Sequence, residues 1–305
     1  MKHYSKFLLE FEKKCKFPEE ANAEINKLAK RLDDEKDFGK RFDRIRKLYM
    51  YPWAHNLGRY LKMARELGEE YGVTENAVEF MFLLQCAELL KKRFIAKGVS
   101  EEIYWDSMND LRYKLLECME CEHEVGTFVG GWFAGWFEVD RFTLGRFQFE
   151  PREVDEDYTT KSGYKIKKGD FCVGMHIPSS GVPLTDEVRY DSYKRAYEFF
   201  KDRLTDGKLI IKCGSWLLYE NHYKFLPEHL NILKFMDDFD IYSSEESDRF
   251  GDDWRVFGHF TEYPLEEWPE DTSLRKAYKH WLLNGGKAGH GDGVIVFDGE
   301  KIISK

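Results

Sequence analysis

Residues 174–187 read GMHIPSSGVPLTDE, and the interpretation of the second half of the chain depends on them. A short apolar segment, 171–177, runs into a Ser-Ser-Gly turn, and Asp186 to Leu204 then carries apolar residues at helical spacing. This pattern predicts a strand, a turn and a helix capped by Thr185. α/β proteins that bind phosphate groups often hold them at such a turn, beside the N-terminus of the helix.

Two features of the turn weaken the phosphate interpretation. Pro183 has no N–H to donate, and Asp186 and Glu187 place negative charge in the first turn of the predicted helix, where they would repel a phosphate. Taken alone, these residues favour an ordinary connection over a phosphate cradle. His176, at the end of the predicted strand, is the ionisable side chain that we single out in this segment.

Around this stretch, the chain from residue 126 onward alternates between predicted strands and helices. A strand is predicted over 141–150, with a bulge at Gly145, and 209–218 is typical of a buried strand. The same criteria predict strands at 164–168, 240–242 and 255–260, helices at 226–235 and 272–283, and a hairpin at 293–303.

Before residue 126 the pattern is helical throughout. Ile25, Leu28, Ala29 and Leu32 recur at helical spacing, and prolines and glycines supply the breaks between such segments. The sequence therefore predicts a two-domain α+β or α/β protein. A helical bundle over 1–125 would precede a mixed-sheet α/β domain over 126–305.

The composition excludes several classes of protein. The 305 residues carry a formal net charge of −9, which argues against a nucleic-acid partner because phosphate binding needs a concentrated basic surface. No apolar run approaches the roughly 20 residues of a membrane helix. The charged N-terminus is unlike a signal peptide, so a cytoplasmic protein is expected, with its six scattered cysteines as reduced thiols.

The segment Cys213-Gly-Ser-Trp216 closes the predicted strand at 209–218. α/β enzymes bind ligands beyond the carboxyl ends of strands, so Cys213 or Ser215 is a candidate nucleophile with His176 as its base. This hypothesis of a thiol hydrolase competes with a structural interpretation, in which Cys213 is buried, Ser215 caps a turn and Trp216 lines the core or a pocket. Because the chain has no Gly-x-Ser-x-Gly elbow, the structural interpretation is favoured.

Two further features carry weaker chemical signals. Cys118 and Cys121 form a C-x-x-C pair with His123 nearby, but a structural zinc ion usually needs four ligands and the chain has no second pair. We therefore expect no metal site and assign these cysteines to packing. His290 lies in the glycine-rich stretch GKAGHGDG and is expected to be a polar loop residue.

Five motifs then follow one another in a recognisable order: LGRFQFE (144–150), HIPSSGVPL (176–184), CGSWLL (213–218), LPEHLNILKF (226–235) and DTSLRKA (271–277). Together they resemble a bacterial acyltransferase-domain family, in which an N-terminal helical domain precedes a GNAT-like C-terminal domain. The resemblance covers essentially the whole chain. Two positions depart from the family pattern, since Gly214 stands where histidine is usual and Leu230 where serine is usual.

The resemblance implies an acyl-CoA-dependent N-acyltransferase, with acetyl-CoA or another acyl-CoA as donor and a small-molecule or peptide amine as acceptor. In such an enzyme a base accepts the proton of the amine, and backbone donors polarise the thioester carbonyl. The implied roles are His176 or Glu150 as the base, Ser215 or Cys213 near the acyl group or the leaving thiol, Ser179, Ser180 and Gly181 as the pyrophosphate turn, and Arg146, Trp216 and Asn231 as substrate-binding or structural residues.

An alternative hypothesis is a non-catalytic ligand-binding or regulatory protein that retains the GNAT-like fold. It is motivated by residues 179–181, which lack the glycine-rich signature that GNAT-like proteins usually carry at the pyrophosphate turn. Arg146 and Glu150 are equally well explained as a structural ion pair. The helical domain is a candidate for the acceptor side of the cleft or for a homodimer surface.

Overall fold

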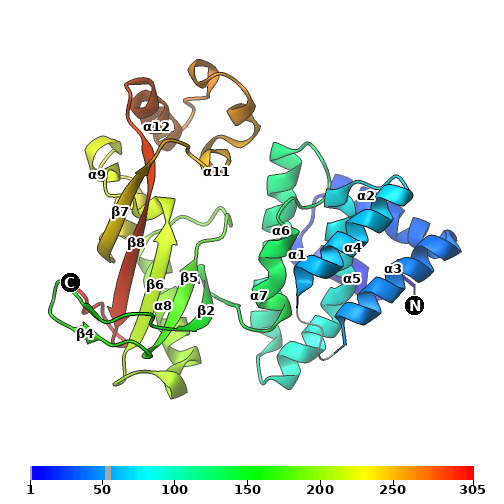
Figure 1. Cartoon of the computed structure of the whole chain (residues 1–305), viewed down its shortest axis with the longest axis horizontal. Coiled ribbons are helices and arrows are strands. Elements are labelled where there is room, and N and C mark those ends of the chain that lie inside the picture. Colours follow the sequence, from blue (N-terminus) through cyan, green and yellow to red (C-terminus); the bar gives the residue numbers. More distant parts are fainter. Residues whose placement is uncertain (1, 52–55) are drawn as a thin grey trace. The chain divides into compact units, whose positions relative to one another are not determined.

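The computed structural model describes residues 2–51 and 56–305, which form two compact units. The first unit runs through Phe142 and is helical, and the second comprises Thr143–Lys305 and is built on a sheet (Figure 1). The predicted fold class, a helical domain followed by a mixed-sheet domain, is confirmed. Within the described residues, no helix is long and apolar enough to cross a membrane.

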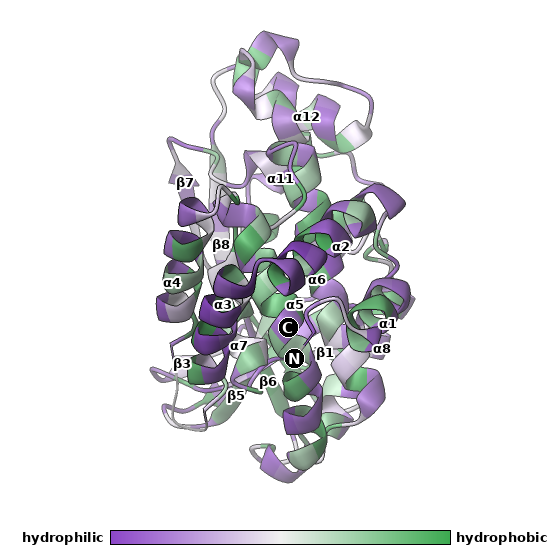
Figure 2. Ribbon diagram, turned by 90° about the vertical axis from the view of Figure 1, so that its right-hand side faces the viewer, coloured by the Kyte–Doolittle hydropathy of each residue, from purple (hydrophilic) through white to green (hydrophobic). Residues whose placement is uncertain are grey.

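The first unit packs its helices around α5 (Glu75–Ala96), whose residues Phe80, Phe82 and Leu83 are fully buried. Side-chain caps start several of the helices, for example Thr74, whose hydroxyl accepts a hydrogen bond from the N–H of Ala77. The other helices are α1 (Lys6–Cys15), α2 (Glu19–Asp34), α3 (Lys36–Tyr49), α4 (Leu57–Glu70) and α6 (Glu101–Cys121). In Figure 2, α2 and α3 are largely hydrophilic, whereas α5 is largely hydrophobic, as expected of outer and central helices.

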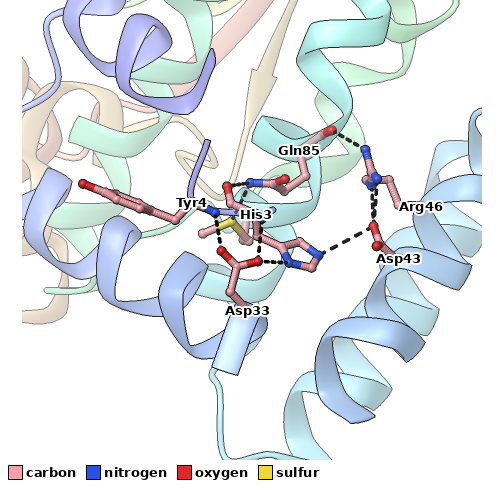
Figure 3. Close-up of polar contacts among 7 residues, drawn as sticks. His3, Tyr4, Asp33, Asp43, Arg46 and Gln85 are labelled. Carbon is pink, nitrogen blue, oxygen red and sulfur yellow. Dashed lines mark hydrogen bonds and ion pairs between the residues drawn. The ribbon is translucent and has the colours of Figure 1, made fainter. Parts of the chain in front are cut away.

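The N-terminal segment is fixed to this unit by the buried side chain of His3 (Figure 3). Its Nδ1 lies 3.0 Å from Asp33 Oδ1, and its Nε2 lies 3.6 Å from Asp43 Oδ1. Arg46 Nη2 donates to the same Asp43 oxygen at 2.7 Å, and Gln85 Nε2 donates to the carbonyl oxygen of His3 at 2.8 Å. The imidazole of His3 therefore ties the start of the chain to α2 and α3, and its backbone carbonyl ties it to α5.

Residues 126–142, which the sequence assigns to the second domain, lie in the first unit. Two short helices, η1 (Gly130–Phe133) and α7 (Ala134–Phe137), bury Phe133 and Trp136 against α4 and α5. The guanidinium of Arg141 lies 4.3 Å from the ring centre of Trp132 and 4.6 Å from that of Trp136. The aromatic residues of this segment thus complete the helical core rather than open the sheet.

The second unit contains a six-stranded sheet in the order β1-β2-β5-β6-β8-β7. Strands β5 and β6 are parallel, and the pairs β2–β5, β6–β8 and β7–β8 are antiparallel. The strands are β1 (Phe142–Leu144), β2 (Phe147–Glu153), β5 (Phe171–His176), β6 (Leu209–Ser215), β7 (Asp240–Ser247) and β8 (Ala288–Phe297). A separate hairpin consists of β3 (Tyr158–Thr159) and β4 (Lys165–Ile166).

Two helices, α8 (Asp186–Phe199) and α10 (Asn231–Met236), cover one face of the sheet. Phe147 stacks on Tyr193 of α8 with 5.7 Å between ring centres and lies 5.8 Å from Phe235 of α10. On the opposite face, the β3–β4 hairpin closes a small apolar cluster that includes Ile166 and Ile210. The buried carboxylate of Asp240 holds this hairpin by accepting from Tyr158 and from the backbone N–H of Lys161.

The remaining helices lie at one end of the sheet. The observed elements differ from three of the predictions. The predicted strand at 255–260 is helical and forms α11 (Asp253–Phe257) and η4 (Gly258–Glu262), because Phe257 packs on Trp268 with 4.5 Å between ring centres. Of the helix predicted at 226–235, only 231–235 is helical, as part of α10, and a separate short helix, α9 (His222–Phe225), precedes the predicted range. Gly145 is the turn between β1 and β2, with φ +74°, and not a bulge. The prediction at 272–283 is confirmed by α12 (Ser273–Leu283).

Candidate active site

The parallel strands β5 and β6 separate at their carboxyl ends. Their pairing extends from Cys172 and Ile210 to Gly174 and Lys212, whereas β5 continues to His176 and β6 continues to Ser215. A cleft of about 310 Å³ lies there, lined among others by Gly174, His176, Lys212, Gly214 and Asp292. In open α/β sheets, ligands bind beyond the carboxyl ends of the strands, so this cleft is the candidate site.

His176 and Glu150 meet at the edge of this cleft. In the antiparallel pair β2–β5, Glu150 lies opposite Gly174, two residues before His176, so both side chains project from the same face. Nε2 of His176 lies 3.3 Å from Oε2 of Glu150, and Arg152 Nη2 donates to the other carboxylate oxygen at 3.2 Å. A carboxylate beside an imidazole stabilises the imidazolium, which is what a proton acceptor needs.

Cys213 borders the cleft, but its side chain points away from it. Residues alternate along β6, so Cys213 projects from the helix-covered face while Gly214 shares the face of His176. The side chain is 3% exposed, and its burial, together with the charge of Asp292, raises the pKa of the Cys213 thiol to about 12. A protonated thiol on the other side of the sheet from His176 is no nucleophile for it, which contradicts the hypothesis of a thiol hydrolase.

The residues that follow Cys213 have structural partners. Ser215 Oγ accepts from the N–H of Leu217 at 3.1 Å and so caps the turn η3 (Trp216–Leu218), as the structural interpretation predicts. Trp216 packs edge-on against His222, Phe250 and Tyr278. Asn231, half-buried, is the first residue of α10. Neither Ser215 nor Asn231 is among the residues that line the cleft.

The turn after β5 is held from outside by Arg146. Its Nε donates to the carbonyl oxygen of Val182 at 2.9 Å, and its Nη1 donates to that of Pro178 at 2.8 Å. Within the turn, Ser180 donates its N–H to Pro178, Val182 donates its N–H to Ser180 Oγ, and Gly181 has φ +75°. Two of the amides that could cradle a phosphate are thus engaged inside the turn itself.

A buried arginine on α8 was not apparent from the sequence. Arg189 is 2% exposed and donates to both carboxylate oxygens of Asp238, at 2.6 and 3.3 Å, and to the carbonyl oxygen of Leu184 at 2.7 Å. It also pairs with Asp186, whose charge stands in the first turn of α8. The sequence pattern could have indicated a buried arginine, because a positive charge stands four residues before Tyr193, on the apolar stripe of the helix.

His290 was also misjudged from the sequence, because it lies on β8, together with Asp292, and not in a loop. Asp292 is directly opposite Gly214, and His290 is two residues along the same face. The glycine between them is required by the packing on the helix side, because a Cβ at Gly291 would lie 2.2 Å from the carbonyl oxygen of Leu218. The alternation of glycine with His290, Asp292 and Val294 was the signal for a strand.

The cleft has features that fit a thioester of CoA. It opens between parallel strands, and Gly174 and Gly214 leave the strand backbone uncovered by their own side chains. Its lining carries both charges: the cations Arg152 and Lys212, each paired with a carboxylate, and the acids Glu153, Asp155 and Asp292. Among the described residues, no group of three or more His, Cys, Asp or Glu side chains is arranged to hold a metal ion. A second cavity, of about 450 Å³, lies within the helical unit and has a floor of Ile25, Leu28 and Phe80.

A helical unit followed by a mixed sheet with a cleft at its only described parallel strand pair defines a GNAT-like acyltransferase architecture. Residues 142–295 match the model of the GNAT-like C-terminal domain, and residues 6–139 match that of the N-acyltransferase N-terminal domain. The chain therefore belongs to the GNAT-like N-acyltransferase family that these two domains define. No curated protein matches the sequence significantly.

Solved structures of acyltransferases share the fold. One, in complex with decanoyl-CoA and teicoplanin, has a TM-score of 0.74 and 20% identity, covering 94% of this chain and 87% of that one. A mutant in complex with octanoyl-CoA has a TM-score of 0.73 and 19% identity over 96% and 88% of the two chains. Another, with decanoyl-CoA, has a TM-score of 0.60 and 21% identity over 95% and 99%. At these identities the similarity establishes the fold.

Proposed function

We propose that the protein transfers an acyl group from an acyl-CoA to the amine of a small molecule or peptide. The observation that carries the proposal is the cleft between the carboxyl ends of β5 and β6 with the His176–Glu150 pair at its edge. The similar structures bind decanoyl-CoA and octanoyl-CoA, and one binds the glycopeptide teicoplanin. A medium-chain acyl-CoA is therefore a better first donor to test than acetyl-CoA.

In this mechanism His176 accepts the proton that the amine loses when its nitrogen attacks the thioester carbonyl. Glu150 is a positioning residue, because its carboxylate orients the ring and stabilises the imidazolium that forms. Lys212 and Arg152 supply positive charge for the acidic part of CoA. Arg146, Ser180 and Gly181 keep the turn after β5 in one conformation beside α8.

The first test is calorimetry with CoA, decanoyl-CoA and acetyl-CoA, followed by detection of released thiol with a panel of amines. We expect binding at micromolar concentrations, and a His176→Ala variant that binds decanoyl-CoA normally but releases CoA about 100-fold more slowly. A Glu150→Gln variant should lose about tenfold in kcat, with little change in the Kd of the thioester.

No binding of any of the three ligands at several hundred micromolar would contradict the transferase proposal. Binding without thiol release from any amine would instead favour the non-catalytic hypothesis, in which the fold retains a ligand and has lost the reaction. A cytoplasmic location, a homodimer and the use of acetyl-CoA stay predictions of the sequence.

A further inference from the structure

The proposed reaction requires a second proton transfer. Neither Cys213 nor Ser215, the residues that the sequence places near the leaving thiol, can donate this proton. When the C–S bond breaks, the leaving thiolate needs a proton. Cys213 and Ser215 flank Gly214 in β6, so both project from the other face of the sheet. The proton donor must therefore lie elsewhere around the cleft.

The sheet register places a second ionisable pair across the opening from His176. Had the parallel pairing continued by two residues, His176 would lie opposite Gly214, and Gly214 is itself opposite Asp292 of β8. One row of the sheet therefore presents His176 on the β5 side of the opening and Asp292 on the β6–β8 side. His290 follows on the same face of β8, opposite Glu245 of β7.

Gly214 makes room for this second pair. A Cβ at position 214 would lie 2.5 Å from Asp292 Oδ1, 3.1 Å from His290 Cε1 and 3.6 Å from His290 Nε2. The carboxylate and the edge of the imidazole thus occupy the volume that a side chain at position 214 would take. Any larger residue at position 214 would displace the side chains of Asp292 and His290, which explains why a glycine stands there.

We propose that His290 is the general acid of the reaction, with Asp292 beside it on the same face of β8. This inference rests on the proposed function. His290 is exposed and therefore within reach of water, and an imidazole is the side chain best suited to donate and regain a proton near neutral pH. The two histidines, one on each side of the opening, divide the two proton transfers between them.

The step balances as follows. The lone pair of the amine nitrogen forms the C–N bond with the thioester carbon, and the C–S bond breaks with its electron pair going to sulfur. His176 takes one proton from the nitrogen, and the protonated His290 gives one proton to the sulfur. Exchange with water then returns His176 to the neutral form and His290 to the protonated form, leaving an amide and free CoA.

The experiment uses the full chain with decanoyl-CoA as donor and hydroxylamine as a generic acyl acceptor. His290→Ala and His290→Gln should slow thiol release at saturating decanoyl-CoA about 100-fold, the lower end of what general acid catalysis contributes. Calorimetry should give the Kd for decanoyl-CoA within twofold of the wild type. His280→Ala, on an exposed turn of α12, is the matched control and should keep the wild-type rate.

The pH profile distinguishes an acid from a structural residue. In the wild type the rate should fall at alkaline pH as His290 loses its proton, and this fall should disappear in His290→Gln. An alkaline limb that persists unchanged in His290→Gln would overturn the assignment.

A chemical probe tests the location without any acceptor. Decanoyl-CoA should protect His290 from carbethoxylation by diethyl pyrocarbonate at least fivefold, as mapped by peptide mass, and should leave His280 unprotected. If calorimetry shows that decanoyl-CoA binds and His290 stays unprotected, the inference is wrong while the proposed function stands. If wild-type protein binds no acyl-CoA, the proposed function fails and this inference fails with it.

Discussion

At the scale of the residue, the site depends on which face of the sheet each side chain takes. His176 and Gly214 share the cleft face, and Cys213, one residue away from Gly214, belongs to the opposite layer beneath α8. A shift of one position in the register would exchange the thiol for the glycine and remove the space that His290 and Asp292 occupy. The chemistry is thus specified by the alternation of β6 as much as by the residue types.

This placement gives a prediction for Cys213. Burial raises the pKa of its thiol to about 12, so almost none of it is thiolate at neutral pH. We expect iodoacetamide at pH 7 to modify the half-buried Cys121 before Cys213, as measured by peptide mass. Cys213→Ala should keep thiol release from decanoyl-CoA within about threefold of the wild type and lower the free energy of unfolding by roughly 1–2 kcal/mol.

The contrary outcome is selective alkylation of Cys213 at neutral pH, accompanied by loss of activity. It would restore the thiol hydrolase hypothesis and require the strand to open in solution. Cys121→Ser serves as the control, since it removes the expected modification and leaves the sheet unchanged.

At the scale of the element, the hairpin β1–β2 holds the turn that follows β5. Gly145 adopts φ +74°, which allows a tight turn, and the next residue, Arg146, directs its guanidinium onto the carbonyl oxygens of Pro178 and Val182. Arg146 therefore orders a loop without regular structure that lies 32 to 36 residues further along the sequence.

Arg146→Ala should loosen this turn without unfolding the sheet. We expect the amides of residues 179–183 to exchange hydrogen at least tenfold faster, because two charge-assisted hydrogen bonds to the turn are lost. The Kd of CoA should rise about fivefold if the turn contacts it. Arg146→Lys, which retains the charge and one donor direction, should show an intermediate effect, and equal exchange in all three proteins would refute the role.

The elements that were predicted correctly carry their own local pattern. The stripe around Tyr193 predicts α8, and Thr272 caps α12 through the N–H of Arg275. The elements that were predicted wrongly depend on distant partners: residues 255–260 are helical because of Trp268, and 126–142 join the first unit because α4 and α5 offer an aromatic surface. Local sequence does not contain those partners.

The candidate site divides in the same way. His176 and Glu150 were predicted, but as alternatives, because only the register of β2 on β5 shows that they form one pair. His290 was interpreted as a loop residue, because glycines at 289, 291 and 293 resemble a turn. They are instead strand residues whose missing side chains leave room for Tyr219, Leu218 and Phe239. Such packing is decided by tertiary contacts.

At the scale of the molecule, each unit has its own core, so acid should affect the two units differently. In the helical unit, burial opposes ionisation of Asp33 and Asp43, but the hydrogen bonds from His3, and for Asp43 those from Arg46, outweigh it and lower the pKa of both carboxyls. A carboxyl whose folded-state pKa is depressed contributes stability above its unfolded value of about 3.9, and this stability is lost as the pH falls through the folded value.

Asp43→Asn should therefore destabilise the helical unit at neutral pH by about 2 kcal/mol, because it leaves His3 and Arg46 with a neutral partner. Native-state hydrogen exchange of the full chain measures this in α2 and α3, with the sheet amides as an internal reference. The difference between the variant and the wild type should shrink as the pH falls from 5 to 2, because below about 3.9 the unfolded carboxyl is protonated while the lowered pKa of Asp43 keeps the folded one ionised. Asp34→Asn, an exposed neighbour, should leave exchange unchanged, and an equal loss in both variants would attribute the effect to net charge instead of to the contacts of His3.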